Sequence, residues 1–415
     1  MKKLIFCNLD LLKSQFDPDD YSAVDLSSID YKELEKKRDK FIKKFIELAE
    51  DTENKICFYS RKSEMLKKFK LVHKHDENFH FVQRNSVREF VMSNKNINNL
   101  FVFIGGKNKD FELAVNSRSL FIVPTWLPLE DKPERYGIHV DTVKQLYKFI
   151  LTLNNQNTWY SVLEIDSITT CYSLMDARFG YYAKTLEEKD MLLHFQELLK
   201  EGKSRNYYQI LLYHFLAGMT NTMDFDDIEL FGVIPSSDKS VNRDLFAFMT
   251  QVRQLKGKQL PKRNMTVGEP EYANLLIRHT KKRKAHIGRT PQERAMLGGE
   301  EEFATLYINP DYKKRIEALK SQGRFNVCIF DDYMTHGNSF NSVRNLLENL
   351  GANKIIFVSL GLFRNPFQKK DYNIWGSVYN GDYVWELCDD EILNNFVINE
   401  EAKQEVSDLY DIFNS

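Results

Sequence analysis

The first third of the chain alternates short apolar runs with longer segments of helical periodicity. Apolar runs at residues 4–9, 55–59, 100–104 and 119–123 have the length and composition of buried β-strands. Residues 31–50 instead space their apolar side chains three or four positions apart, which predicts a long amphipathic helix. Alternating strands and helices are typical of a parallel sheet, whose site lies at the carboxyl ends of the strands.

The rest of the chain repeats this alternation after a change in composition. Proline and charged residues gather at 124–135 and a polar run follows at 154–157, so a domain boundary is expected between them. Beyond it, strands or strand pairs are expected at 160–183, 229–235, 326–330 and 354–359, and amphipathic helices at 186–201, 207–218, 243–254, 340–350 and 400–413. We therefore expect a first domain at 1–135, a linker at 136–158, a second domain at 159–390 and a C-terminal helical segment at 391–415.

Composition narrows the functional classes. The 415 residues carry 58 basic and 59 acidic side chains, so bulk charge argues against a nucleic-acid or membrane-surface protein. The five cysteines are odd in number and show no Cys-x-x-Cys spacing, which argues against a disulfide framework or a zinc site and favours a reducing, cytoplasmic location. No apolar run approaches the roughly 20 residues of a membrane span. The helix at 400–413 is expected to pack on its own domain or on a partner, either a second copy or another protein.

The stretch from 326 to 350 has the layout of a phosphate site. An apolar run ends in the adjacent carboxylates Asp331 and Asp332, and a short polar loop then leads into a helix. The N–H groups of such a loop and the positive end of the helix bind phosphate, while carboxylates one step earlier can accept hydrogen bonds from vicinal hydroxyls. A ribose 5-phosphate satisfies both parts.

The pattern Asp-Asp-x-x-Thr-x-Gly-x-Ser resembles the loop with which type I phosphoribosyltransferases bind 5-phosphoribosyl 1-pyrophosphate (PRPP). It matches at Asp331, Asp332, Thr335, Gly337 and Ser339. The loop also contains His336, where a second threonine is usual, and Asn338. The resemblance implies that the acid pair holds the ribose hydroxyls, that the loop holds the 5-phosphate, and that Mg²⁺ reaches the acids indirectly, through PRPP. A generic strand, turn and helix with a capping serine is the alternative.

A second loop follows the apolar run at 229–235. It contains Ser236, Ser237 and Lys239, and Arg243 opens the next helix. Exposed N–H groups and two cations can hold a second anion. In phosphoribosyltransferases the pyrophosphate loop stands at this point of the chain, although Pro-Ser-Ser also occurs in many ordinary turns.

Between the two loops lies a basic cluster at residues 278–294. Within it, Arg289-Thr-Pro-Gln resembles the mobile flap of the ComF competence proteins, a branch of the same family. The resemblance implies that Arg289 and its neighbours close over pyrophosphate. A solvated basic surface is an equal alternative, and nucleic-acid binding or modification by an effector protein is a third.

The expected strand ends of the first domain carry their own polar set. The residues are Asn8, Asp10, Ser60 and Asp110. Their order resembles the haloacid dehalogenase (HAD) superfamily, in which Asn8 would take the place of the nucleophilic aspartate. Because a carboxamide cannot form an aspartyl-phosphate, the resemblance implies a phosphatase-dead domain. The cation of this site is open among Arg84, Lys95 and Lys107, and an unrelated flavodoxin-like or Rossmann-type sheet is the alternative fold.

Together these patterns predict an α/β protein with two parallel-sheet domains, a degenerate HAD-like Rossmannoid and a type I phosphoribosyltransferase fold. The implied activity is Mg²⁺-dependent transfer or cleavage at the N-glycosidic carbon of PRPP or a nucleotide. A non-catalytic module that binds PRPP or a nucleotide as a signal is the alternative.

Overall fold

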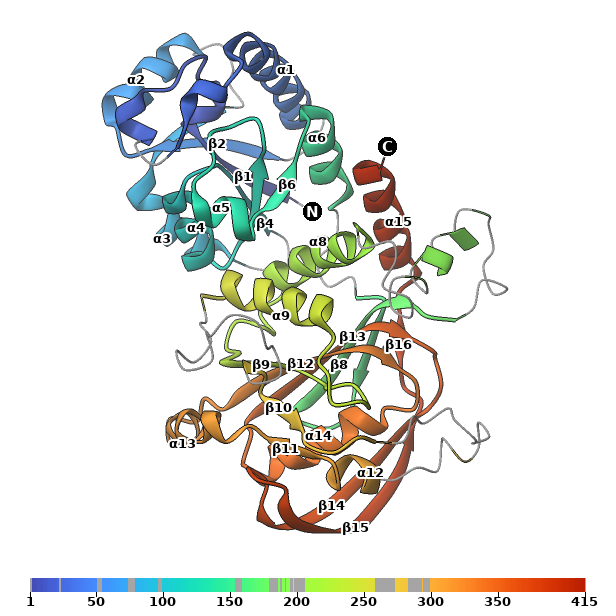
Figure 1. The fold of residues 1–415 in the computed structure, drawn as a ribbon. Coiled ribbons are helices and arrows are strands. Elements are labelled where there is room, and N and C mark those ends of the chain that lie inside the picture. The colour runs from blue at the N-terminus through green and yellow to red at the C-terminus, as the bar shows by residue number, and fades with distance from the viewer. Residues whose placement is uncertain are drawn as a thin grey trace.

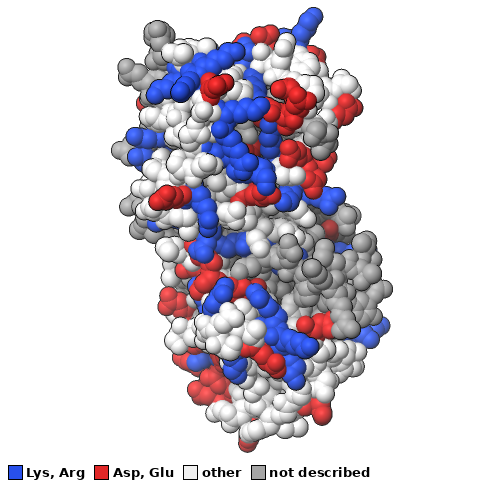
Figure 2. Space-filling model, turned by 90° about the vertical axis from the view of Figure 1, so that its left-hand side faces the viewer, with Lys and Arg blue, Asp and Glu red and all other residues white. Residues whose placement is uncertain are grey.

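The computed structural model describes two sheet-containing halves, stacked along the long axis of the molecule, with helices between them (Figure 1). The described residues are 2–21, 24–50, 54–73, 79–95, 99–153, 159–178, 206–257, 273–282 and 299–414, with isolated residues between 186 and 197 and at 293. Within these residues, no helix has the combination of length and hydropathy that crossing a bilayer requires. Basic and acidic side chains are interspersed over the face shown in Figure 2, in keeping with the balanced composition.

The first sheet, sheet A, is wholly parallel, as its sequence pattern predicts. Its strand order is β3-β2-β1-β4-β5-β6, the order of the classic doubly wound sheet. The strands are β1 (Lys2–Asn8), β2 (Lys55–Ser60), β3 (Phe79–Gln83), β4 (Asn99–Ile104), β5 (Leu120–Pro124) and β6 (Ile138–Val140). The edge strands β3 and β6 were not expected, because β3 is half-exposed and β6 has only three residues, Ile-His-Val. Strand β6 lies within the stretch expected as a linker.

The helices of this half include the long amphipathic helix expected at 31–50, which the structure confirms residue for residue. Its elements are α1 (Tyr31–Glu50), α2 (Ser63–Val72), α3 (Arg84–Asn94), α4 (Asn108–Asn116), α5 (Asp131–Tyr136) and α6 (Val143–Thr152), with 3-10 turns at Leu9–Leu12, Pro18–Tyr21 and Leu26–Ser28. The buried positions of α1 include Leu34, Phe41, Phe45 and Leu48, which share one face of the helix.

The second sheet, sheet B, is mixed, so the expectation of a second parallel sheet is correct only in part. Its order is β16-β7-β8-β13-β12-β9, in which β8, β13, β12 and β9 are parallel. At one edge, β7 is antiparallel to β8 and β16 is antiparallel to β7. The strands are β7 (Ser161–Glu164), β8 (Thr169–Asp176), β9 (Leu230–Val233), β12 (Asn326–Met334), β13 (Lys354–Leu362) and β16 (Val397–Ile398). The connection from β7 to β8 is too short for a parallel crossover, so this pair forms a hairpin. Asp166 stabilises the turn by accepting from the Ile168 N–H at 2.9 Å.

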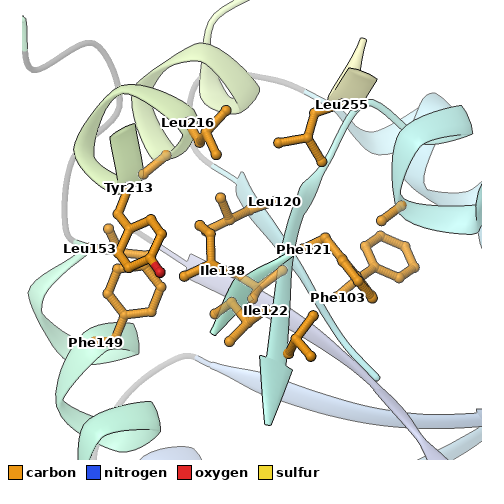
Figure 3. Packing of buried hydrophobic residues seen from close by; sticks show 14 of the residues in the cluster. Phe103, Leu120, Phe121, Ile122, Ile138, Phe149, Leu153, Tyr213, Leu216 and Leu255 are labelled. Atoms are coloured by element: carbon orange, nitrogen blue, oxygen red, sulfur yellow. The ribbon is translucent and has the colours of Figure 1, made fainter. Parts of the chain in front are cut away.

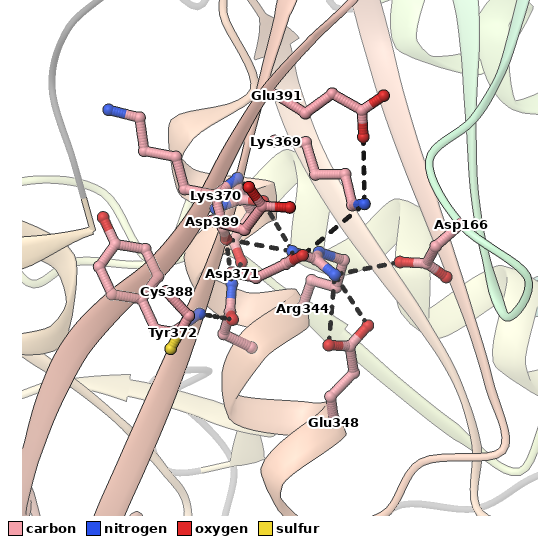
Figure 4. A network of polar contacts seen from close by, with 12 residues as sticks. Asp166, Arg344, Glu348, Lys369, Lys370, Asp371, Tyr372, Cys388, Asp389 and Glu391 are labelled. Atoms are coloured by element: carbon pink, nitrogen blue, oxygen red, sulfur yellow. Dashed lines mark hydrogen bonds and ion pairs between the residues drawn. The ribbon is translucent and has the colours of Figure 1, made fainter.

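A long antiparallel ribbon covers the polar side of the helix that follows β12, and the sequence patterns did not reveal it. The ribbon consists of β14 (Phe367–Ser377) and β15 (Asp382–Leu393), and the helix is α14 (Asn338–Asn349). Asn341, Asn345 and Asn349, one turn apart, bond to backbone groups of β14. Arg344 lies beside them and pairs with Asp166 at 3.1 Å and with Glu348 at 3.0 Å (Figure 4). The segment between β9 and β12 contributes further elements. They are β10 (Leu276–Arg278), α12 (Glu300–Phe303), β11 (Leu306–Ile308), a 3-10 turn (Pro310–Tyr312) and α13 (Lys313–Ser321).

The two halves share one hydrophobic core. Helix α8 (Asn206–Asn221) contacts β4 and β5 of sheet A on one side and β8 of sheet B on the other. Figure 3 shows Tyr213 and Leu216 of α8 against Leu120 and Ile138 of sheet A. An amphipathic helix was expected here, but α8 is buried on nearly all sides because it lies between two apolar surfaces. Two further helices join this layer, α9 (Arg243–Leu255) and the C-terminal α15 (Glu400–Asn414).

Candidate ligand site at the end of strand β12

The acid pair lies at the carboxyl edge of sheet B, as expected. Strand β12 runs between β9 and β13 and continues to Met334, past the last paired residue of β9. Because β9 is the shorter strand, Asp331 and Asp332 stand beyond it and both carboxylates are half-buried at the edge. The parallel strands therefore bring the loops that follow β9 and β12 to the same end of the sheet.

Burial raises the pKa of both carboxyl groups of the acid pair. Burial raises the pKa of Asp331 well above its usual range, and the neighbouring charge of Asp332 raises it further. Burial also raises the pKa of Asp332. The carboxylates are also fixed in place, since Asp331 accepts from the Asp332 N–H at 2.9 Å and Asp332 accepts from the Tyr333 N–H at 2.7 Å. Carboxylate oxygens fixed in this way can accept hydrogen bonds from ligand hydroxyls.

The loop after β12 leads into α14 through a glycine, beside a small cavity. Gly337 is the N-cap of α14 and has a φ of +75°, a left-handed conformation that suits glycine. Since it has no side chain, it leaves the helix N-terminus without a side-chain cap. A cavity of about 90 Å³ opens here, and its lining includes Thr335, Asn338 and Ser339. His336 is half-buried beside it, and its carbonyl accepts from the Gln368 N–H at 2.9 Å.

Glu302 of α12 faces the same loop, although no sequence pattern singled it out. Its carboxylate accepts from the Ser339 hydroxyl at 2.7 Å, pairs with Arg278 at 2.7 Å and contacts the Lys282 ammonium. Burial alone would raise the pKa of Glu302, but Lys282 and Arg278 outweigh burial and lower it to about 2. An internal carboxylate therefore lies at the N-terminal end of α14, where the motif predicts an anion.

The second loop lies close to the first, connected to it through the basic cluster. The carbonyl of Pro235, at the start of this loop, accepts from Arg278 at 3.3 and 3.2 Å, and the Ser237 carbonyl accepts from the Lys282 N–H at 2.8 Å. Because Arg278 and Lys282 also contact Glu302, these two residues connect the predicted pyrophosphate loop to the predicted phosphate loop. Arg278 is buried and structural, so it is not part of a solvated basic surface.

The other residues of the second loop differ in position. Ser236 and Lys239 are exposed, and Lys239 has a φ of +85°. Arg243 is the first residue of α9 and is exposed. The N-terminus of α9 is capped by Asn242, whose side chain accepts from two N–H groups at 3.1 Å, so an anion there would compete with this cap. Arg289 and the rest of the proposed flap pattern lie outside the described residues.

In the first half, the structure brings most of the polar strand-end residues together. The Asn8 side chain donates to Asp110 at 2.7 Å, and its carbonyl oxygen accepts from the Asp10 N–H at 2.9 Å. Burial raises the pKa of Asp110 to about 6. Burial would also raise the pKa of Asp10, but Lys107 and Lys13, at 3.2 and 2.6 Å, lower it overall.

Of the three cations that the sequence left open, Lys107 is the one that pairs with Asp10, where Lys13 also lies. Arg84 donates to the Lys109 carbonyl, whereas Lys95 lies between the halves, 3.6 Å from Asp226. Ser60 ends β2, the strand beside β1, and its hydroxyl accepts from the Lys62 N–H at 3.1 Å.

The described part of the chain contains neither a disulfide nor a cluster of metal-ligating side chains. The five cysteines, all of them described, are free thiols. Among the described residues no group of three or more His, Cys, Asp or Glu side chains is arranged to hold a metal ion. Comparison of the chain with known proteins found no matching family model, no matching curated protein and no matching solved structure.

Proposed function

We propose that the second half of the chain binds a ribose 5-phosphate ligand, either PRPP or a nucleotide, and acts on it as a phosphoribosyltransferase. The observation that carries the proposal is the half-buried acid pair one step before a glycine-capped helix N-terminus on the same sheet edge. The second loop supports it, because β9 is the neighbour of β12 and both loops leave the same edge.

In this proposal, different residues of the site bind the ribose, the 5-phosphate and the pyrophosphate of the ligand. Asp331 and Asp332 bind and orient the ribose hydroxyls, and the loop from Thr335 to Ser339 binds the 5-phosphate. Lys239 and Arg243, exposed beside the second loop, provide positive charge toward a pyrophosphate group. A nitrogen nucleophile then forms a bond to the anomeric carbon as the bond to pyrophosphate breaks, with an oxocarbenium-like transition state. Mg²⁺, when bound with the ligand, neutralises charge on the departing pyrophosphate.

Calorimetry of the full chain with PRPP and with ribose 5-phosphate, each with Mg²⁺, tests the proposal. Replacing Asp331 and Asp332 by alanine removes hydroxyl contacts of about 1 kcal/mol each, so affinity should fall by roughly tenfold to a hundredfold. A matched control replaces the adjacent acids Asp389 and Asp390, which are exposed on β15, and should leave affinity unchanged. Absence of binding by the wild-type chain, or unaltered binding by the Asp331 and Asp332 variant, would exclude the proposal.

One observation favours a non-catalytic alternative, in which the chain binds PRPP or a nucleotide as a signal. The Asn8 amide donates to Asp110 in the first half, where the resemblance to phosphatases requires a nucleophilic carboxylate. If the first half has lost a catalytic group, the site in the second half can likewise bind its ligand without catalysing a reaction. Turnover assays with Mg²⁺-PRPP and a panel of bases separate the two functions, since a sensor binds PRPP without releasing pyrophosphate.

A further inference from the structure

Glu302 occupies the place of an anion in the cradle at the N-terminus of α14. Its carboxylate accepts from the Ser339 hydroxyl at 2.7 Å and lies against the Lys282 ammonium, and both residues line the cavity at the loop. We propose that Glu302 is a specificity-determining residue: its carboxylate takes the place of the ligand's phosphate, and a phosphate enters only by displacing it. The inference deepens the proposed function and rests on it.

The charges around Glu302 indicate which anions can displace it. Arg278 and Lys282 contribute two positive charges, and Glu302 contributes one negative charge. A carboxylate ligand would replace one monoanion by another and gain nothing. A phosphomonoester dianion, in contrast, balances both cations. The cradle should therefore select phosphate dianions over carboxylates of similar size.

A phosphate cannot bind beside Glu302 in its present position. Ser339 donates its only hydroxyl proton to Glu302, so it has none for a phosphate oxygen. Like charges at such short range also repel each other strongly. Displacement removes both obstacles, because it frees the Ser339 hydroxyl and leaves Lys282 to pair with the ligand.

The packing around α12 limits the displacement to one side chain. Phe303, the next residue, is buried, with its ring 5.0 Å from that of Tyr372, and its carbonyl accepts from the Tyr383 hydroxyl at 2.8 Å. Arg278 also stays in place, because Pro235 and Thr305 accept hydrogen bonds from it independently of Glu302. The backbone of α12 is thus held, and rotation of the Glu302 side chain is the movement that remains.

The test compares Glu302→Gln with Glu300→Gln, which removes the same charge from an exposed position of the same helix. Calorimetry with ribose 5-phosphate, inorganic phosphate and free ribose, each with Mg²⁺, measures affinity. Glu302→Gln should bind both phosphates at least about tenfold more tightly than wild type, since a neutral amide competes poorly with a dianion. Its affinity for free ribose should not change, and Glu300→Gln should resemble wild type throughout.

The outcomes separate this inference from the proposed function. If wild type binds ribose 5-phosphate and folded Glu302→Gln binds it equally or less tightly, Glu302 is a fixed support and the inference fails while the proposed function stands. If neither wild type nor Glu302→Gln binds either phosphate, both fail. Should Glu302→Gln not fold, Glu302→Asp keeps the negative charge on a side chain that is one methylene shorter and reaches less far toward Ser339. Phosphate affinity above that of wild type then supports displacement, and affinity equal to or below wild type excludes it.

Discussion

At the scale of single residues, burial sets the chemistry of the polar edge of sheet A. Asp110 is 2% exposed and accepts from the Asn8 amide, while Asp10 is held by two lysines. The two carboxyl groups lie close together but have opposite pKa shifts, because only Asp10 has cations beside it. Asn8 avoids placing a further negative charge against Asp110, which suits a structural role for this edge.

The shifted pKa of Asp110 predicts a dependence of stability on pH. Because the pKa rises from 3.8 to about 6 on folding, the folded chain binds this proton more tightly. The stabilisation is therefore fully present below about pH 4 and is lost as the pH rises through about 6. Asp110→Asn should remove this component, so that between pH 4 and 6.5 the free energy of unfolding of the variant falls less with rising pH than that of wild type.

Denaturant unfolding across this pH range, with Asp382→Asn on the exposed surface as control, measures the effect. Parallel curves for wild type and Asp110→Asn would show that Asp110 is already ionised in the folded chain at low pH.

At the scale of elements, the entry into α14 depends on its packing partner as much as on the loop itself. A Cβ atom added to Gly337 would lie 2.0 Å from the ring of Phe367, the first residue of β14. A phosphate bound close to the backbone would be one reason for a glycine at this position. The ring of Phe367 is a second reason, because it leaves no room for a side chain. Strand β14 of the ribbon thus packs against the candidate phosphate loop at Gly337.

This packing predicts a difference between two glycines with similar backbone conformations. Gly323 has a φ of +63°, and an added Cβ there meets no atom within 4 Å. Gly323→Ala should therefore cost only the left-handed conformation, about 1–2 kcal/mol. Gly337→Ala should cost that amount and roughly 1–3 kcal/mol more, because Phe367 must move. Denaturant unfolding of both variants measures the difference, and equal losses would mean that the β14 contact yields freely.

In the whole molecule, one hydrophobic cluster includes buried residues of both halves. Leu216 of α8 is fully buried, and its helix packs on strands of both sheets. The C-terminal helix adds to this layer, since Phe413 contacts Phe149 of the first half and Tyr213 of α8, at ring-centroid distances of 5.5 and 5.0 Å. These helices contribute buried side chains to the hydrophobic cluster that extends through both halves.

We therefore predict that Leu216→Ala destabilises both sheets together, by about 2–5 kcal/mol. Hydrogen exchange of β4 and β13 peptides at increasing denaturant should show the same loss of protection in both strands. Val91→Ala, at a fully buried position of α3, changes the first half alone. It should nevertheless reduce protection of both strands equally if the chain unfolds as one unit. Loss of protection in one sheet alone would indicate independent domains.

Local patterns in the sequence were sufficient to predict several elements and part of the candidate site. The α1 helix and the central strands β1, β2, β4, β12 and β13 follow from apolar periodicity, and the acid pair and glycine follow from their order along the chain. These features could be predicted because each depends on one continuous segment of the chain.

Contacts between residues far apart in the sequence became apparent in the folded chain. Glu302 reaches the N-terminus of α14, Phe367 packs behind Gly337, and Lys107 rather than Lys95 pairs with Asp10. Helix α8 is buried on nearly all sides, and β7 and β16 make sheet B mixed. Each of these contacts joins side chains or strands far apart in sequence, and local hydrophobic patterning carries no information about such pairs. The packing of the elements brings them together and so sets the charge and shape of the candidate site.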